Sequence, residues 1–233
     1  VGATPETAHT RLWNGTAYYR PFDYAAPAPY LVRYLDYKGG VVYQQYVNAG
    51  ETVEPPTPPT FPGLTFSGWA GSGALVTNSI DIVGVWAPTD GKAHVFVEAS
   101  ALVGLRPTLK INKSDTSTLL VEWGDGTTST TSASGNVTIT KDADYVPGSY
   151  EIKKSISAGT GNFTGGHGTS GNPMMSGVAV TEIWMRTEST TVTDYAMYGT
   201  AFRTMKYISG MAGITSFGAS AAQGCYSLTS LAF

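Results

Sequence analysis

The sequence has one cysteine in 233 residues, so an internal disulfide framework is excluded. Charged residues make up only 13% of the chain, about half the usual share. The net charge of -3 provides neither a basic patch for nucleic acid nor a polybasic signal for a membrane surface. No apolar run approaches the roughly 20 residues that a membrane-spanning helix needs. These shortages argue against disulfide-rich, nucleic-acid-binding and helical membrane proteins.

In place of charge, the chain is rich in glycine, threonine, serine and tyrosine, and 42% of its residues are apolar. This composition favours strands and turns, because few helix-forming faces of Glu, Lys and Ala remain. The length allows one large domain or several small ones. We therefore expect a mainly β protein, made of tandem small β modules followed by a partial repeat array.

The middle of the chain contains the clearest hairpin pattern. Residues 119–128 read Leu-Leu-Val-Glu-Trp-Gly-Asp-Gly-Thr-Thr, an apolar run that ends at Trp123. Asp125-Gly126 then lies between two strand-like runs and predicts a tight turn, because both residues tolerate positive φ.

This stretch resembles the polycystic-kidney-disease (PKD) type of immunoglobulin-like domain over residues 106–158. The resemblance rests on Trp123-Gly-Asp-Gly-Thr127 and Pro147-Gly-Ser-Tyr150. The family usually has His-x-Tyr before the Pro-Gly, whereas this chain has Asp144-Tyr145. The resemblance implies an immunoglobulin-like β-sandwich at residues 100–158, which acts as a spacer in extracellular proteins and has no chemistry of its own.

Residues 30–99 begin with two strand patterns around Lys38-Gly-Gly40, followed by a proline-rich stretch at residues 55–62. Proline cannot donate to a sheet, so this stretch is expected to be an extended connection. The segment resembles the internalin B-repeat, or Listeria–Bacteroides repeat, and the residues that carry the resemblance are Asp36, Gly39, Gly50, Pro56, Pro59, Gly63, Phe66, Gly68 and Trp69. The resemblance implies a β-grasp-like module of bacterial surface proteins, with residues 94–98 as an extra strand or a link.

Two segments carry weaker patterns. Residues 1–29 read as an arm in which Trp13-Asn14-Gly15 predicts a hairpin, similar to hairpins in bacteriophage tail proteins. Residues 159–179 are rich in glycine but lack the lysine and the following helix of a phosphate-binding loop. We expect a linker or surface loop there.

From residue 180 onward, short apolar patterns recur about 23 residues apart, within the range of leucine-rich repeats. The motif from Gly224 to Leu231 resembles the BspA-like leucine-rich repeat. The resemblance makes Cys225 a small, buried packing group. We expect residues 180–233 to be a partial array that continues beyond Phe233, because short repeats bury their apolar faces only against neighbours.

No catalytic or metal-binding pattern is present in the sequence. His9, His94 and His167 lie far apart, and no pair has metal-ligand spacing. Asp125, Asp142 and Asp144 could contribute oxygens to Ca²⁺, which stays open as an alternative. A full calcium site needs roughly six to eight oxygens in a fixed loop, and the Asp-x-Asp-x-Asp-Gly pattern of such a loop is absent, so Asp125 is better explained as a turn residue. No paired carboxylates stand in a recognisable context, so we expect neither a cofactor nor enzymatic activity.

Aromatic residues provide the remaining functional signal, with fourteen Tyr and five Trp. In a sparsely charged β protein they either form exposed platforms for sugars or fill the cores. Trp184, Tyr207 and Tyr226 are the candidate binding residues. The residues expected to have structural roles are Gly68, Trp69, Trp123, Asp125, Gly126, Tyr150 and Cys225.

These resemblances predict a non-catalytic adhesion protein of the cell surface, with the β modules as stalk and the repeats as the face that binds a surface protein or glycan. Two alternatives stay open. The hairpin motif is compatible with a bacteriophage tail or virion protein, either structural or receptor-binding. The aromatic content is compatible with a glycan-binding accessory region of a larger enzyme. The expected location is extracellular or, for the phage alternative, the virion.

Overall fold

The computed structural model describes residues 10–13, 16–19, 29–165, 172–186, 191–211 and 214–229. In these ranges the chain forms strands and one 3-10 turn, η1 (Thr200–Phe202), so the mainly β prediction is confirmed. No helix in these ranges is long and apolar enough to span a membrane. Strands β1 (Thr10–Trp13) and β2 (Thr16–Tyr19) pair antiparallel, as the expected hairpin requires, and residues 14 and 15 between them lie outside the described ranges.

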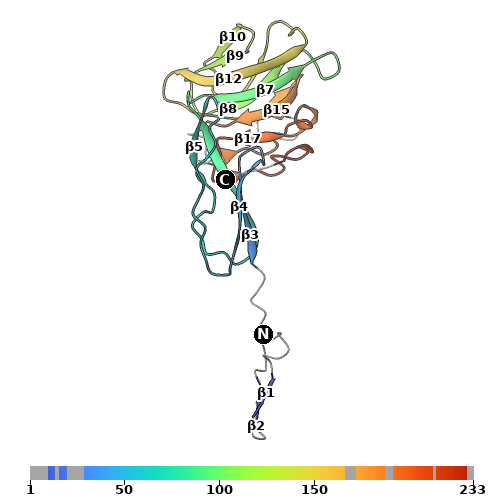
Figure 1. Ribbon diagram of the computed structural model, residues 1–233. Helices are drawn as coiled ribbons and strands as arrows, with labels where there is room; N and C mark the ends of the chain where they lie inside the picture. Colours follow the sequence, from blue (N-terminus) through green and yellow to red (C-terminus); the bar gives the residue numbers. More distant parts are fainter. Residues whose placement is uncertain are drawn as a thin grey trace.

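Four strands build the first module, which we define as residues 30–88 (Figure 1). They are arranged in the order β4-β3-β6-β5, with β3 parallel to β6. Their bounds are β3 (Tyr30–Leu35), β4 (Val41–Val47), β5 (Leu64–Trp69) and β6 (Ile80–Pro88). The proline-rich stretch contains no strand, as expected, and indole N–H groups fix it. Trp69 donates to the carbonyl of Pro56 at 3.2 Å, and Trp86 donates to that of Pro59 at 3.3 Å.

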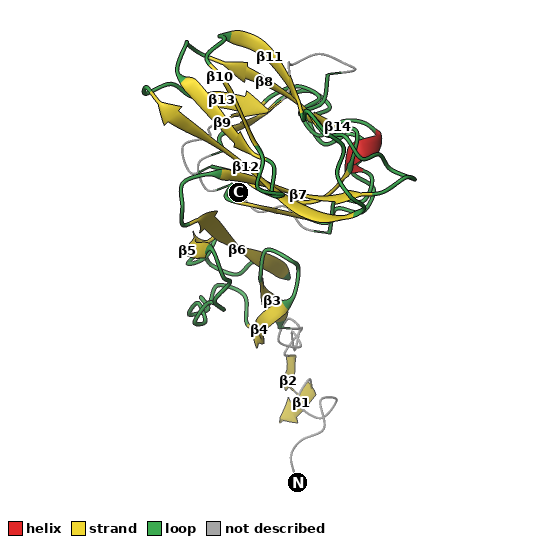
Figure 2. Cartoon of the chain, turned by 90° about the horizontal axis from the view of Figure 1, so that it is seen from above, coloured by secondary structure: helices red, strands yellow, loops and turns green. Residues whose placement is uncertain are grey.

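The rest of the chain forms a β-sandwich whose two main sheets face each other (Figure 2). The larger sheet has the order β10-β9-β12-β7-β15-β17, and the smaller has the order β11-β8-β13, with β14 also paired to β8. The strands of the larger sheet are β7 (Ala93–Ala99), β9 (Thr118–Glu122), β10 (Thr128–Thr131), β12 (Gly148–Ala158), β15 (Ala179–Trp184) and β17 (Tyr207–Ser209). Those of the smaller sheet are β8 (Thr108–Lys113), β11 (Gly135–Thr140), β13 (Phe163–Gly165) and β14 (Met175–Ser176).

Strands β9 and β10 form the hairpin that the Asp-Gly pair predicts, but the turn has a different geometry. Gly124 and Gly126 have positive φ of 84° and 87°, whereas Asp125 does not. The Oδ1 atom of Asp125 accepts hydrogen bonds from the backbone N–H of Thr127 at 3.0 Å and from its hydroxyl at 2.6 Å. Asp125 thus does not use its tolerance of positive φ, and its carboxylate stabilises the loop from an ordinary backbone conformation.

The C-terminal part is stacked in parallel as two turns of a coil, which we call the two-coil segment (residues 179–229). Strand β15 pairs with β17, and β16 (Thr191–Val192) pairs with β18 (Ser216–Phe217). Paired residues are 25 positions apart, since residue 182 lies opposite 207 and residue 191 opposite 216. The hydroxyl of Thr204 also donates to the carbonyl of Val180 at 3.0 Å. This offset is close to the sequence period of about 23 residues.

The two-coil segment and the sandwich share one core. Strand β15 pairs antiparallel with β7, and one hydrophobic cluster extends from Ala93 to Leu228. The segments expected as separate units, residues 100–158 and 180–233, are therefore packed together. Strands β13 and β14 lie inside the expected linker at residues 159–179 and pair with β8. These strands pack on the sandwich because their apolar side chains Phe163 and Met175 are buried in its core. Burial of apolar surface is the main driving force of packing.

The first module contacts the sandwich through Trp86. Its backbone carbonyl accepts hydrogen bonds from the N–H of Gly210 at 2.5 Å and from the hydroxyl of Ser209 at 2.7 Å. The hydroxyl of Tyr37 donates to Glu182 at 2.9 Å. An apolar cluster from both parts surrounds this contact and consists of Tyr37, Phe61, Leu64, Phe66, Trp69, Trp86, Trp184 and Tyr207.

Candidate functional site

The outer face of the larger sheet carries polar and aromatic side chains in adjacent positions on neighbouring strands. Glu151 of β12 lies opposite Phe96 of β7, and Lys153 lies opposite His94. Directly opposed residues of antiparallel strands share a face of the sheet. The intervening residues Val95 and Ile152 are fully buried in the core on the other face. Alternation in β7 and β12 thus places the charged residues together.

Two hollows on this face meet at Glu151, and we call them together the outer groove. The larger has a volume of about 310 Å³ and is lined by Phe96, Val97, Glu98, Ser149, Tyr150, Glu151, Thr181 and Glu182. The smaller has a volume of about 290 Å³ and is lined by Glu122, Gly124, Gly126, Thr127, Thr128, Glu151 and Lys153. The lining contains four glutamates and one lysine, so the outer groove is acidic.

A buried histidine supports the middle of the outer groove. His94 is only 3% exposed, and its Nδ1 lies 2.7 Å from Glu151 while its Nε2 lies 2.9 Å from Asp90. Burial alone would raise the pKa of Asp90, but hydrogen bonds from His94 and from the backbone N–H of Lys92 hold it below its ordinary value. Because carboxylates occupy both ring nitrogens, His94 has no nitrogen available as a general base or metal ligand.

One glutamate of the outer groove is held in a fixed orientation. Glu182 accepts hydrogen bonds from the Trp184 indole at 2.5 Å and from the Tyr37 hydroxyl at 2.9 Å, and Lys38 lies 3.5 Å away. The Trp184 ring lies 4.7 Å from that of Phe96, centroid to centroid. Carboxylates can accept hydrogen bonds from hydroxyl groups, and aromatic rings can pack on apolar C–H faces. Chemically, the groove suits a polyhydroxylated ligand.

Two of the three predicted binding residues, Trp184 and Tyr207, lie on the paired strands β15 and β17 and belong to the same apolar cluster, whereas Tyr226 lies apart from them. Trp184 borders the outer groove beside Phe96. Tyr207 lies near the first module, where the amine of Lys38 is 5.1 Å from its ring centroid. Tyr226 is 82% exposed on the second coil and, among the described residues, makes no ring contact with the other two.

The residues expected to be structural occupy structural positions in the fold. Trp123 is buried, and its backbone carbonyl accepts a hydrogen bond from the Tyr145 hydroxyl. Tyr150 stacks on Tyr145 with ring centroids 3.8 Å apart. The ring of Trp69 packs against that of Tyr34 with centroids 5.0 Å apart. Gly68 has a φ of 150° and lies at a shift in the register between β5 and β6.

The geometry of the described residues does not favour a nucleophilic cysteine or a metal-binding site. Burial raises the pKa of the Cys225 thiol to about 11, which disfavours the thiolate needed by a nucleophile, and its Sγ lies 3.2 Å from the carbonyl of Met197. Within the described ranges, no group of three or more His, Cys, Asp or Glu side chains is placed to hold a metal ion. The sequence positions His9 and His167 lie outside those ranges.

The sequence did not predict the outer groove. Its residues come from strands far apart in the chain, and only the register of β7, β12 and β15 brings them together. The alternation in β12 was the one available signal, because it separates Glu151 and Lys153 from the core. No family model, characterised protein or solved structure matches the chain in comparisons of sequence and fold.

Proposed function

We propose that this chain is a non-catalytic adhesion fragment of a cell-surface protein. In this proposal the β modules form a stiff stalk, and the two-coil segment with the adjoining outer groove forms the binding face. The observation that carries it is the fusion of the two-coil segment to the larger sheet through β15 and β7, which places exposed aromatic and acidic side chains on a rigid support. Binding residues gain precision when the elements beneath them are rigid.

The proposal includes three finer assignments. Residues 30–88 would be a B-repeat-like module, supported by the strand arrangement and by Trp69, which holds the proline-rich stretch. The PKD-like sandwich is supported by the buried Trp123 and the turn at Asp125. The repeat of BspA-like type is supported by the parallel offset of 25 residues between the coils.

The surroundings of His94 and Cys225 support a proposal of binding over one of catalysis. His94 is engaged at both nitrogens, and burial disfavours ionisation of the Cys225 thiol. The proposal is thus for a surface that recognises a partner and leaves it chemically unchanged.

A cell-binding assay tests the adhesion proposal. Fluorescently labelled protein is added to bacterial and animal cells, and binding is measured by flow cytometry for wild type, Trp184→Ala and Tyr226→Ala. Tyr46→Ala is the matched control, because Tyr46 is also an exposed tyrosine but lies on the first module. We expect the first two variants to lose binding and the control to retain it. Equal binding by all variants, or none by wild type, contradicts the proposal.

The phage alternative has a separate readout. A virion component of tail type is expected to assemble, so sedimentation of the purified chain as a stable trimer, with no binding to cells, would favour that alternative.

Glycan binding at the outer groove is a second candidate function, and the acidic and aromatic lining favours it. Its test is a glycan array, followed by calorimetry with any hit. Phe96→Ala and Glu98→Gln should weaken binding at least tenfold if their contacts are made, whereas Glu54→Gln, outside the groove, should not. An array without hits would count against this function and leave adhesion to a protein partner.

A further inference from the structure

Strand β4 forms one edge of the sheet of the first module (Figure 1). Among the described residues it pairs only with β3, so the backbone groups on its other side have no strand beside them there. Residues 43–46 are all exposed, and Val47 is the one buried residue of the strand. The core of the module therefore covers the end of β4 at Val47 and leaves most of the strand open.

The sequence of β4 lacks most of the features that protect an open edge. It reads Val-Val-Tyr-Gln-Gln-Tyr-Val, with neither a charged residue nor a proline. Soluble proteins ordinarily protect an edge strand with lysine, proline or a bulge. Strand β4 has one such feature, a shift in its register with β3 that leaves out Val42. Regular pairing therefore extends from Tyr43 to Val47, and these five residues present an unprotected edge.

Exposed aromatic side chains lie on both faces of β4. Tyr43 lies opposite the fully buried Tyr34 and is on the core side of the sheet, whereas Tyr46 lies opposite Leu31 and is on the outer side. The exposed fractions of Tyr43 and Tyr46 are 39% and 67%. A further strand laid along β4 would therefore remove apolar surface from water on both faces, in addition to pairing the backbone.

A second copy of this chain fits the edge because the segment is complementary to itself. When a two-fold axis relates two antiparallel strands, the residue on the axis lies opposite its own copy. Gln45 is the centre of the regular segment, so an axis there pairs all five residues, with Tyr43 opposite Val47 and Gln44 opposite Tyr46. A charged residue at the centre would meet a like charge, whereas a glutamine amide can both donate to its copy and accept from it.

We propose that two copies of this chain pair antiparallel along β4 and join their four-stranded sheets into one continuous sheet. Tyr37 and Lys38, which precede β4, contact Glu182, so each β4 begins near its own sandwich. Antiparallel pairing would therefore place the two sandwiches at opposite ends of the joined sheet. The contact lies apart from the outer groove and does not depend on the proposed function.

The first test is sedimentation velocity of the wild-type chain. A contact between two strands over five residues is smaller than interfaces of standard size, which begin at about 1,200 Å² of total buried surface. We therefore expect a dissociation constant of roughly 10–100 µM, which concentrations of about 5–500 µM bracket. At the lower concentrations of a cell-binding assay the chain would be monomeric.

The sedimentation result decides among the possible occupants of the edge. Growth to a dimer that then stops supports the proposal, because the pairing uses both copies of β4. Monomeric wild type at every concentration would mean that another part of the chain or a different partner covers the edge, and the proposal would be wrong. Continued growth beyond the dimer would also contradict a closed two-fold pair.

A charge variant tests whether β4 is the contact. Gln45→Lys would place two like charges opposite each other at the axis, and we expect the dissociation constant to rise about tenfold or more. Thr65→Lys is the matched control, because Thr65 is exposed on β5, the other edge of the same sheet. It should change the constant by less than about twofold. Equal effects of the two variants, with unchanged Tm values, would contradict pairing along β4.

A cysteine pair tests the register without a change of charge. Residues directly opposite have Cβ atoms about 4.5–5.5 Å apart, whereas diagonal neighbours are about 7–8 Å apart, too far for a disulfide. Under mild oxidation, Gln45→Cys should therefore form a covalent dimer on a non-reducing gel at several times the yield of Gln44→Cys. Wild type, which has the partly buried Cys225, gives the background. Equal yields, or a higher yield from Gln44→Cys, would contradict the proposed pairing.

Discussion

Lys141 and Lys154 are equally buried, each 3% exposed, but their surroundings differ completely. The amine of Lys141 lies 2.7 Å from Asp125 and donates to the carbonyl of Ala143 at 3.0 Å. The amine of Lys154 has only the face of Phe163 among the described residues. The degree of burial therefore does not reveal the role of a lysine. Lys141 pairs with a carboxylate and stabilises a turn, whereas Lys154 lies among apolar groups, where burial opposes its charged form.

Removing the carboxylate from the paired lysine should have the largest effect. Asp125→Ala leaves Lys141 buried without its counter-charge and removes the hydrogen bonds to Thr127. We expect the free energy of unfolding to fall by about 3 kcal/mol in urea titrations. Asp142→Ala is the control, because Asp142 is exposed, and it should change the value by under about 0.5 kcal/mol. A loss below about 1 kcal/mol for Asp125→Ala would mean that the two lysines are energetically alike.

The unpaired lysine should give the second largest effect, seen at alkaline pH. Burial lowers the pKa of Lys154 from 10.5 to about 8, so between these values the unfolded chain holds a proton that the folded chain has released. The free energy of unfolding should therefore rise with pH across this window, by up to about 3 kcal/mol. Lys154→Met should lack the rise. The measurement is urea unfolding at pH 8 and pH 10.5, and parallel changes in both proteins would contradict the prediction.

Acid titration should show the opposite sign at the paired site, with a smaller effect. Burial opposes ionisation of Asp125, but hydrogen bonds from Lys141 and Thr127 outweigh it and lower the pKa from 3.8 to about 2. The resulting stability is fully present above pH 4 and is lost as the pH falls toward 2. We expect it to amount to about 1 kcal/mol after allowance for solvent screening. The difference in stability between wild type and Asp125→Asn should shrink over this range, and a constant difference would argue against the pairing.

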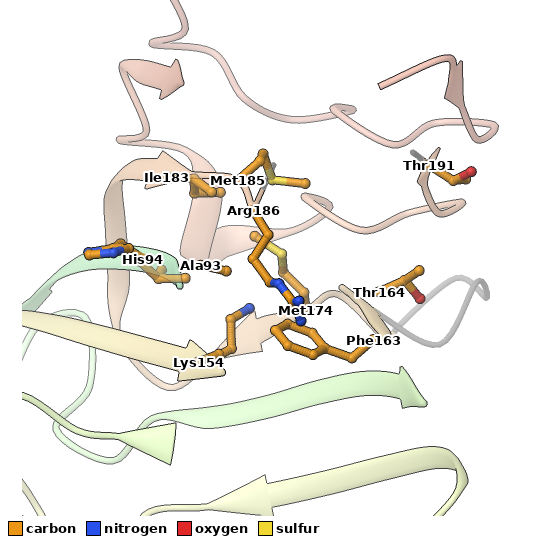
Figure 3. A pocket seen from close by; sticks show the side chains of 11 residues that line it. Ala93, His94, Lys154, Phe163, Thr164, Met174, Ile183, Met185, Arg186 and Thr191 are labelled. Carbon is orange, nitrogen blue, oxygen red and sulfur yellow. The ribbon is translucent and has the colours of Figure 1, made fainter. Parts of the chain in front are cut away.

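The smallest effect is expected from giving Lys154 a carboxylate of its own. Thr164 and Lys154 line one small cavity (Figure 3), and aspartate is close to threonine in size. For Thr164→Asp, we expect the free energy of unfolding in urea titrations to rise by about 1 kcal/mol or less, because the new carboxylate would lie beside the buried amine. A loss of stability in this variant would show that the carboxylate does not pair with Lys154.

The sequence predicted the strands better than their assembly. Alternation and turn patterns involve only neighbouring residues. The sequence therefore predicts the hairpin at Trp123 and the absence of a strand in the proline-rich stretch. The recurring pattern after residue 180 also indicated parallel stacking, which the structure has at an offset of 25 residues. The pairing of β15 with β7 has no local signal, because the two strands are joined only by register and a shared core.

The sites were less predictable than the strands, for the same reason. Alternation in β12 puts Lys154 on the same face as Ile152, but lysine is rarely buried, so the pattern alone does not indicate that this amine lies in the core. Two segments supply Asp90, His94 and Glu151: the first two are four positions apart, whereas Glu151 lies 57 positions after His94. Tyr226 is exposed and Tyr207 is partly packed, and this difference becomes visible only in the fold.

The short connection between β6 and β7 has a mechanical consequence. Strand β6 ends at Pro88 and β7 begins at Ala93, and β7 is bonded on one side to β12 and on the other to β15. Tension applied through the first module would therefore enter an interior strand of the larger sheet and shear two ladders of hydrogen bonds at once. A chain pulled at an edge strand would instead separate one bond at a time. Anchoring at an interior strand would therefore divide a pulling force between two ladders of hydrogen bonds.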